Sequence, residues 1–171
     1  ATVALSHVLG NYQAHSCEYD PEMDGKIEEE IRLLSEIQVG MDEDEFTFFI
    51  QPQCDIAKTK IVGGESLVRW IRRDGSMVSP GKFIPVLEKN GFVADLDMIV
   101  WEKVCRWLRD CLDKGYHPVP ISVNVSPVEF SKETFSDTII ALQKKYQVPP
   151  QYIELEVLES TVTDAVDSVI H

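Results

Sequence analysis

The sequence of 171 residues is long enough for one complete domain or for parts of two. Hydrophobic residues make up 44% and charged residues 26%, so the chain can bury a core and is not disordered by composition. Its formal net charge of -13 argues against nonspecific binding to a nucleic acid polymer or an anionic membrane. A small anionic ligand is not excluded, because a bound cation and a well-placed Arg reverse the charge locally.

The cysteines are scattered and predict no cross-linked framework. Cys17, Cys54, Cys105 and Cys111 form no CxxC pair, so we expect reduced thiols and a cytoplasmic location. No signal peptide is visible and charges interrupt every apolar run, so this segment has no predicted membrane span. The sequence leaves open whether domains upstream of this segment tether a parent protein to the membrane. The first residue is Ala, and we interpret the sequence as a segment of a longer polypeptide.

Residues 1–24 do not resemble the start of a domain. The run ATVALSHVL is typical of a helix end that Gly10 and Asn11 stop, and HSCEY predicts one strand before Asp20 and Pro21. Because this is too little to fold alone, we expect it to dock on residues upstream.

A helix is predicted from about Glu22 to Met41, as the core of a connecting segment at residues 25–44. One apolar stripe runs along it, formed by Ile27, Ile31, Leu34 and Met41. The opposite face is acidic, with Glu28, Glu29, Glu30 and Glu36. We interpret that face as solvated; an acidic binding face is the alternative.

Two strands follow, FTFFIQPQCDI and KIVGGESLVRW, and only Ala57, Lys58 and Thr59 lie around their junction. A parallel crossover needs a dozen or more residues, so these strands must pair antiparallel as a hairpin.

Two helices come next. Ser79 and Pro80 open the first as N-cap and first residue, and Gly91 closes it. The second ends at Gly115. Its predicted inward residues are Leu96, Ile99, Val104, Trp107, Leu108 and Cys111.

The rest of the chain alternates strands with helices. PISVNVS is the third strand, a helix with Phe135, Ile139, Leu142 and Tyr146 follows, YIELEVLE is the fourth strand, and TVTDAVDSVIH begins another helix. The order β-β-α-α-β-α-β-α predicts an α/β fold, a partial and truncated TIM-like (β/α) barrel whose first strand is antiparallel. A closed eight-stranded barrel takes about 250 residues, so roughly half of one is present.

Glu65, Asn124 and Glu156 each lie near the C-terminal end of a predicted strand. The C-terminal rim of such a sheet is where α/β enzymes keep their chemistry. Carboxylate and amide oxygens are the donors that a hard cation such as Mg²⁺ or Mn²⁺ prefers. The leading hypothesis is therefore a metal-dependent site.

Strand periodicity supports this hypothesis. Glu65, Leu67 and Arg69 share one face of their strand. On the third and fourth strands, polar rows containing Asn124 and Glu156 alternate with apolar rows suited to a helix layer. A structural alternative remains: Glu156 pairs with a basic residue and Asn124 bonds a loop, with no metal bound.

The successive motifs resemble those of EAL domains, the phosphodiesterases that hydrolyse the bacterial second messenger cyclic di-GMP. In order, they are IQP at residues 50–52, GGESLVRW, SPGKFIPVLEKNGFV, SVNVSP and ELEVLES. The resemblance covers about residues 45–171, which implies the N-terminal half of an EAL domain. Residues 1–24 more weakly resemble the tail of a GGDEF domain, of the diguanylate cyclase type.

The resemblance implies roles for particular residues. Glu65, Asn124 and Glu156 would be metal ligands, with Glu65 also catalytic. Glu159 would be a catalytic-site carboxylate that holds a mobile loop. The dinucleotide pocket would be lined by Gln51, Leu67 and Arg69, and the guanidinium of Arg69 is suited to bind a phosphate oxygen. The implied reaction is attack of a metal-activated water on one phosphodiester bond, giving linear pGpG.

Some residues depart from the family pattern. Ser66 replaces the central Ala of the name-giving motif, on the strand face opposite Glu65, so we expect a small effect. Leu158 replaces a Thr beside Glu156. The family's paired aspartates, catalytic lysine, and later glutamate and glutamine would lie beyond His171. We therefore expect the 171-residue chain alone to be inactive.

Two hypotheses for the parent protein remain from the sequence. The first is an active cyclic di-GMP phosphodiesterase. The second is a degenerate EAL module that binds cyclic di-GMP or a protein partner without catalysis. In addition, an open sheet edge favours a homodimer of this chain.

Overall fold

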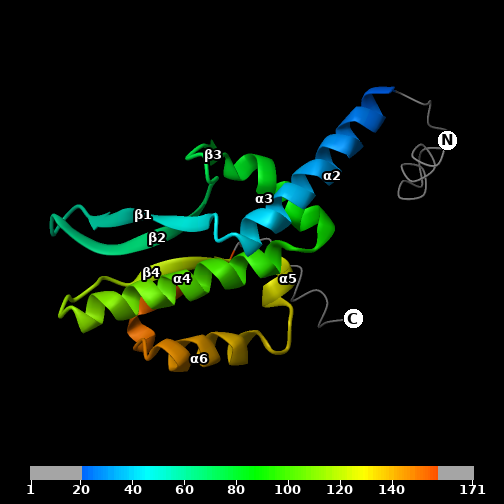
Figure 1. The fold of residues 1–171 in the computed structure, drawn as a ribbon. Coiled ribbons are helices and arrows are strands. Elements are labelled where there is room, and N and C mark those ends of the chain that lie inside the picture. The colour runs from blue at the N-terminus through cyan, green and yellow to red at the C-terminus, as the bar shows by residue number, and fades with distance from the viewer. Residues whose placement is uncertain (1–20, 158–171) are drawn as a thin grey trace.

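The computed structural model describes residues 21–157. Its helices and strands, labelled as in Figure 1, are α2 (Pro21–Asp42), β1 (Phe46–Asp55), β2 (Lys60–Ile71), β3 (Met77–Val78), α3 (Pro80–Asn90), α4 (Val93–Asp113), β4 (Ile121–Val125), α5 (Pro127–Phe130), α6 (Phe135–Tyr146), the 3₁₀ helix η1 (Pro150–Tyr152) and β5 (Ile153–Val157). The long elements follow the predicted order, with β3, α5 and η1 as additions. The predictions for residues 1–20 and for the final helix after β5 lie outside the described residues.

One mixed sheet has the order β1-β2-β4-β5, with β3 paired to the end of β2. β1 and β2 form the predicted antiparallel hairpin, whereas β2, β4 and β5 run parallel. The connection from β2 to β4 contains two long helices, and the connection from β4 to β5 contains α6. The predicted α/β class and the antiparallel first strand are confirmed; within residues 21–157 the sheet is open and not closed into a barrel.

Two apolar cores hold the helices to the sheet. In the first, the apolar row of β4, which includes Ile121 and Val123, packs on Val104 and Leu108 of α4 and on Leu142 of α6. Figure 1 shows α4 running alongside β4, with α6 next to α4. This packing confirms that the apolar row of β4 faces the helix layer.

The second core is aromatic and joins α2 and α3 to the hairpin. Phe46 stacks on Trp70 at a centroid distance of 5.2 Å, and Phe83 of α3 meets both rings edge-on. Ile37 of α2 and Leu87 of α3 complete its centre, and both are fully buried.

The ends of α3 follow the sequence prediction. Ser79 occupies the N-cap and Pro80 the first helical position. Gly91 takes the left-handed conformation, with φ of 78°, and its N–H bonds carbonyls of the last turn. Glycine adopts this conformation without steric cost, which explains why the helix ends there.

Two predicted inward residues are exposed. Ile31 of α2 is 63% exposed, because the buried side of this helix runs instead through Leu34, Ile37 and Met41. Trp107 of α4 is 37% exposed and meets Phe48 of β1 edge-on at 6.3 Å. Ile31 lies outside the face of α2 that the aromatic core covers, and Trp107 is partly covered by β1.

The acidic face of α2 is not simply solvated. Glu30 pairs with Lys89 of α3 at 2.6 Å, and Glu36 pairs with Arg72 beyond β2 at 2.6 Å. These partly exposed pairs orient α2 on the domain and add little to its stability. The interpretation of this face as solvated was therefore wrong for these two residues.

Close approach of α2 to the aromatic core depends on Gly40. A Cβ added at Gly40 would lie 2.9 Å from Nε1 of Trp70, which is buried and bonded to Glu45. We expect Gly40→Ala to lower the free energy of unfolding by about 1–3 kcal/mol, because a rigid indole must move. Urea denaturation followed by fluorescence measures this change.

The matched control is Gly25→Ala in the same helix, where a Cβ would meet nothing within 4 Å. Alanine is the better helix former by about 0.5–1 kcal/mol, so this variant should be more stable than the parent. Equal effects of the two substitutions would contradict the packing argument.

Candidate metal centre

Strand register brings the predicted polar residues into neighbouring positions. Gln51 of β1 is opposite Glu65 of β2, and Glu65 is beside Ser122 of β4. Asn124 of β4 is beside Glu156 of β5. Because side chains two residues apart share a face, these five residues form one polar row across four strands.

Hydrogen bonds link this row. Asn124 donates from Nδ2 to Oε1 of Glu65 at 3.4 Å. Ser122 donates from Oγ to Oε2 of Glu156 at 3.1 Å. The three candidate ligands thus come from three adjacent strands and lie together, and Ser122 of the same polar row holds one of them.

The donor chemistry of this row fits a hard divalent cation. Two carboxylates and one amide oxygen are available, from Glu65, Glu156 and Asn124. The side chains of Asn124 and Glu156 are exposed. Within residues 21–157, no three His, Cys, Asp or Glu side chains form a cluster suited to a metal ion. The candidate set contains only two residues of those types, and its third oxygen comes from an amide.

A cavity of about 300 Å³ adjoins the carboxyl ends of β2 and β4. The sheet contributes two sets of lining residues: Ser66, Leu67, Val68 and Arg69 of β2, and Asn124 and Val125 of β4. Its other walls come mainly from α3 and α4 and include Pro80, Ile84, Glu88, Leu96, Asp97 and Val100. Two of the predicted substrate residues and one predicted ligand thus line the same cavity, whereas Gln51 and Glu65 do not line it.

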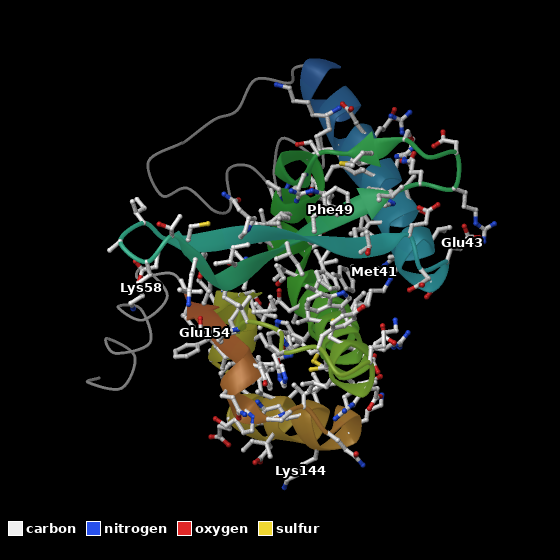
Figure 2. The ribbon with its side chains drawn as sticks, turned by 90° about the vertical axis from the view of Figure 1, so that its left-hand side faces the viewer. Met41, Glu43, Phe49, Lys58, Lys144 and Glu154 are labelled. Atoms are coloured by element: carbon white, nitrogen blue, oxygen red, sulfur yellow. The ribbon has the colours of Figure 1, made fainter. Side chains whose placement is uncertain are left out.

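The rim above Glu65 carries an aromatic and a basic side chain. Phe49 of β1 is opposite Leu67, and the guanidinium carbon of Arg69 lies 5.2 Å from the centre of the Phe49 ring. Arg69 also donates to the carbonyl oxygen of Val68 at 2.8 Å. Figure 2 labels Phe49 on β1, Lys58 at the hairpin tip and Glu154 on β5.

Ser66, the departure in the name-giving motif, is buried and satisfied. Its Oγ donates to the carbonyl oxygen of Ser122 at 2.8 Å, across the β2–β4 junction. Because Ser66 is adjacent to Glu65 in a strand, its side chain lies on the opposite face. Leu158 and Glu159 lie outside the described residues.

Helix α4 holds the end of β4 through two polar contacts. Trp101 donates from Nε1 to the carbonyl oxygen of Asn124 at 2.9 Å. Asp97 accepts from the backbone N–H of Ser126, also at 2.9 Å. Sequence reasoning missed both contacts, because an apolar helical stripe does not reveal which strand carbonyl an indole reaches.

Asp97 is an unusual carboxyl group. Burial raises its pKa to about 6; the Glu129 carboxylate acts in the same direction, whereas the bonds from Ser126 and the charge of Lys132 oppose the shift. Glu129 is itself buried and pairs with Lys132 at 2.5 Å.

A mixed sheet with an antiparallel first strand, helix-covered parallel strands and a polar row at their carboxyl ends defines part of an α/β barrel with a candidate metal centre. The chain belongs to the EAL domain family, whose model matches residues 34–171.

Relatives of known sequence and structure agree with this assignment. Signaling protein YkoW of Bacillus subtilis is 33% identical over 138 residues, which are 80% of this chain and 17% of YkoW. The bifunctional diguanylate cyclase/cyclic di-GMP phosphodiesterase MucR of Pseudomonas aeruginosa is 26% identical over 168 residues, which are 98% of this chain and 24% of MucR. The chain thus spans less than a quarter of either relative.

The fold matches the structure of the PaMucR phosphodiesterase in complex with c-di-GMP. The TM-score is 0.73 at 27% identity, covering 80% of this chain and 56% of that one. The EAL enzyme Bd1971, in its cAMP and cyclic-di-GMP bound form, gives a TM-score of 0.73 at 26% identity, covering 85% and 42%. Among the described helices of this chain, none is both long and apolar enough to cross a membrane.

Proposed function

We propose that this chain is part of a cyclic di-GMP phosphodiesterase that hydrolyses its substrate to linear pGpG with Mg²⁺ or Mn²⁺. The observation that carries the proposal is the linked row of Glu65, Asn124 and Glu156 on adjacent strands of an EAL-family sheet. Similarity to MucR, named a cyclic di-GMP phosphodiesterase, supports the choice of substrate.

In this proposal the row supplies oxygen donors to the metal. Glu65, Asn124 and Glu156 hold it, and Ser122 fixes the orientation of the Glu156 carboxylate. The bound metal would polarise the phosphate and lower the pKa of a water molecule. Glu159, as a second catalytic carboxylate, is proposed to hold a loop of the site.

Substrate contacts are assigned to the rim. Arg69 offers a planar pair of N–H donors to a phosphate oxygen. Leu67 and Arg69 line the cavity beside Asn124, which supports their placement against the dinucleotide. Gln51, opposite Glu65, would contact the substrate from β1.

The wider organisation is proposed on the same basis. Residues 1–24 would be the remnant of a GGDEF-like domain, 25–44 a connecting helix and 45–171 the EAL portion. Reduced thiols at Cys54, Cys105 and Cys111 support a cytoplasmic location. Among the strands that the structure describes, β5 ends the sheet, and this edge supports a homodimer.

Metal removal tests the proposed activity. A protein carrying the complete EAL domain should convert cyclic di-GMP to linear pGpG with Mg²⁺ or Mn²⁺, lose this activity in EDTA and regain it when metal is returned. Chromatography of the nucleotides measures product, and the 171-residue chain alone should give none.

Calorimetry with cyclic di-GMP separates the alternative. Tight binding by the complete domain with no product under any metal condition would contradict the phosphodiesterase and establish a module that binds without catalysis. If the complete domain neither binds cyclic di-GMP nor forms product, both hypotheses are contradicted.

A further inference from the structure

Trp101 and Asp97 lie one helical turn apart on the side of α4 that faces β4. Both residues bind the end of this strand. The indole N–H of Trp101 donates to the carbonyl oxygen of Asn124, and the carboxylate of Asp97 accepts from the backbone N–H of Ser126. Val125, between the two contacts, is buried in the first core. The segment is therefore held at three successive residues by one helix and the core beneath it.

The β2–β4 pairing stops just before this segment. Its last paired residues are Ser66 and Val123, so backbone pairing to β2 does not extend to Asn124. On the other side, pairing with β5 continues through Val125. Contacts from α4 thus supplement a strand that has lost one of its two neighbours at the position of the candidate ligand.

We propose that Trp101, with Asp97 in support, is a positioning residue that sets where the Asn124 side chain lies in the metal centre. This inference rests on the proposed function of that centre. The direction of a side chain follows the backbone that carries it. The Asn124–Glu65 contact, at 3.4 Å, is already near the limit for a hydrogen bond, so a small backbone rotation would separate the two groups.

Burial protects the hydrogen bond of Trp101 from replacement by water. Trp101 is only 2% exposed, so water cannot readily replace the indole N–H as a partner for the Asn124 carbonyl. The ring also packs against Phe135 of α6, at a centroid distance of 6.0 Å. Trp101→Phe retains an aromatic ring for this packing and removes the N–H donor.

The test compares Trp101→Phe with Trp107→Phe in the ¹⁵N-labelled 171-residue chain. Trp107 undergoes the same chemical change on the same helix, but its ring packs on Phe48 of β1, and the hydrogen bond to the Asn124 carbonyl comes from Trp101. Two quantities are measured: the chemical shifts of the Asn124 side-chain amide without metal, and the dissociation constant for Mn²⁺ from the broadening of that signal.

Trp101→Phe should shift the Asn124 amide signal and raise the Mn²⁺ dissociation constant about tenfold, as loss of a group that orients a ligand does. Trp107→Phe should leave the signal in place and change the constant less than about twofold. A purely structural role predicts equal metal affinity in both folded variants, and this result would overturn the proposal.

Asp97 provides a second route if Trp101→Phe does not fold. Asp97→Ala removes the acceptor for Ser126 and should shift the Asn124 signal in the metal-free chain, whereas Asp97→Asn keeps an acceptor oxygen and should restore it. An unmoved signal in Asp97→Ala would overturn the proposal. If Mn²⁺ leaves the Asn124 signal of the parent chain unbroadened, Glu65, Asn124 and Glu156 alone do not hold the metal, and the metal-free shifts of Asp97→Ala and Asp97→Asn decide the positioning role.

Discussion

Glu65→Ala should reduce cyclic di-GMP hydrolysis by about a thousandfold or more in a protein that carries the complete EAL domain, since it removes a metal ligand and not merely a substrate contact. Asn124 would lose the acceptor for its side-chain N–H at the same time. The loss should appear in kcat, measured by chromatography of the linear product at saturating metal and substrate.

Stability should hardly change in this variant. Glu65 is only half-buried, and its side-chain bond to Asn124 is long. Thermal unfolding of the metal-free protein should therefore match that of the parent within a few degrees, consistent with a small loss of surface interaction.

Glu154→Ala is the matched control for Glu65→Ala. Glu154 is an exposed carboxylate in the same row, beside Ser122, but it is not one of the three candidate ligands. It should retain most of the activity. Equal losses in both variants would show that the row acts only through its total negative charge, and full activity in Glu65→Ala would remove Glu65 from the metal centre.

Phe83→Ala should lower the free energy of unfolding by about 3–5 kcal/mol, the usual cost of removing a buried aromatic ring. Phe83 is 0% exposed and its ring meets both Phe46 and Trp70 edge-on. Its loss would leave a void where α3 meets the hairpin. Urea titration of the 171-residue chain, followed by Trp fluorescence and by circular dichroism, measures the change.

Phe49→Ala provides the comparison. Phe49 is 47% exposed and contacts the Arg69 guanidinium at the rim. Truncating it should cost at most about 1 kcal/mol. If the two Phe variants were equally unstable, the aromatic core around Phe83 would not be what holds α3 in place.

The main elements could be predicted because their signals are local. The few residues between two β-branched runs required an antiparallel hairpin, and the glycine at position 91 marked the end of α3. Alternation along β4 also separated its buried apolar row from Asn124. Each of these inferences uses spacing that a single segment contains.

Contacts between segments were harder to predict. Ile31 fits the apolar spacing of α2 but lies outside the face that the aromatic core covers. Trp101 and Trp107 look alike in sequence, yet only the first reaches the carbonyl of Asn124. The family resemblance marked the candidate ligands, but the interactions that support them depend on how α4 crosses the sheet.

The reversed direction of β1 has a consequence for how the chain enters this domain. In an all-parallel barrel, the segment leading into the first strand arrives at the end remote from the active site. Here Glu45, immediately before β1, accepts from the Trp70 indole and lies beside Ile71, so the entry point and the reactive rim share one end of the sheet. The turn that links α2 to β1 thus lies at the same end of the sheet as the candidate centre, and a segment that precedes α2 reaches the domain from that end.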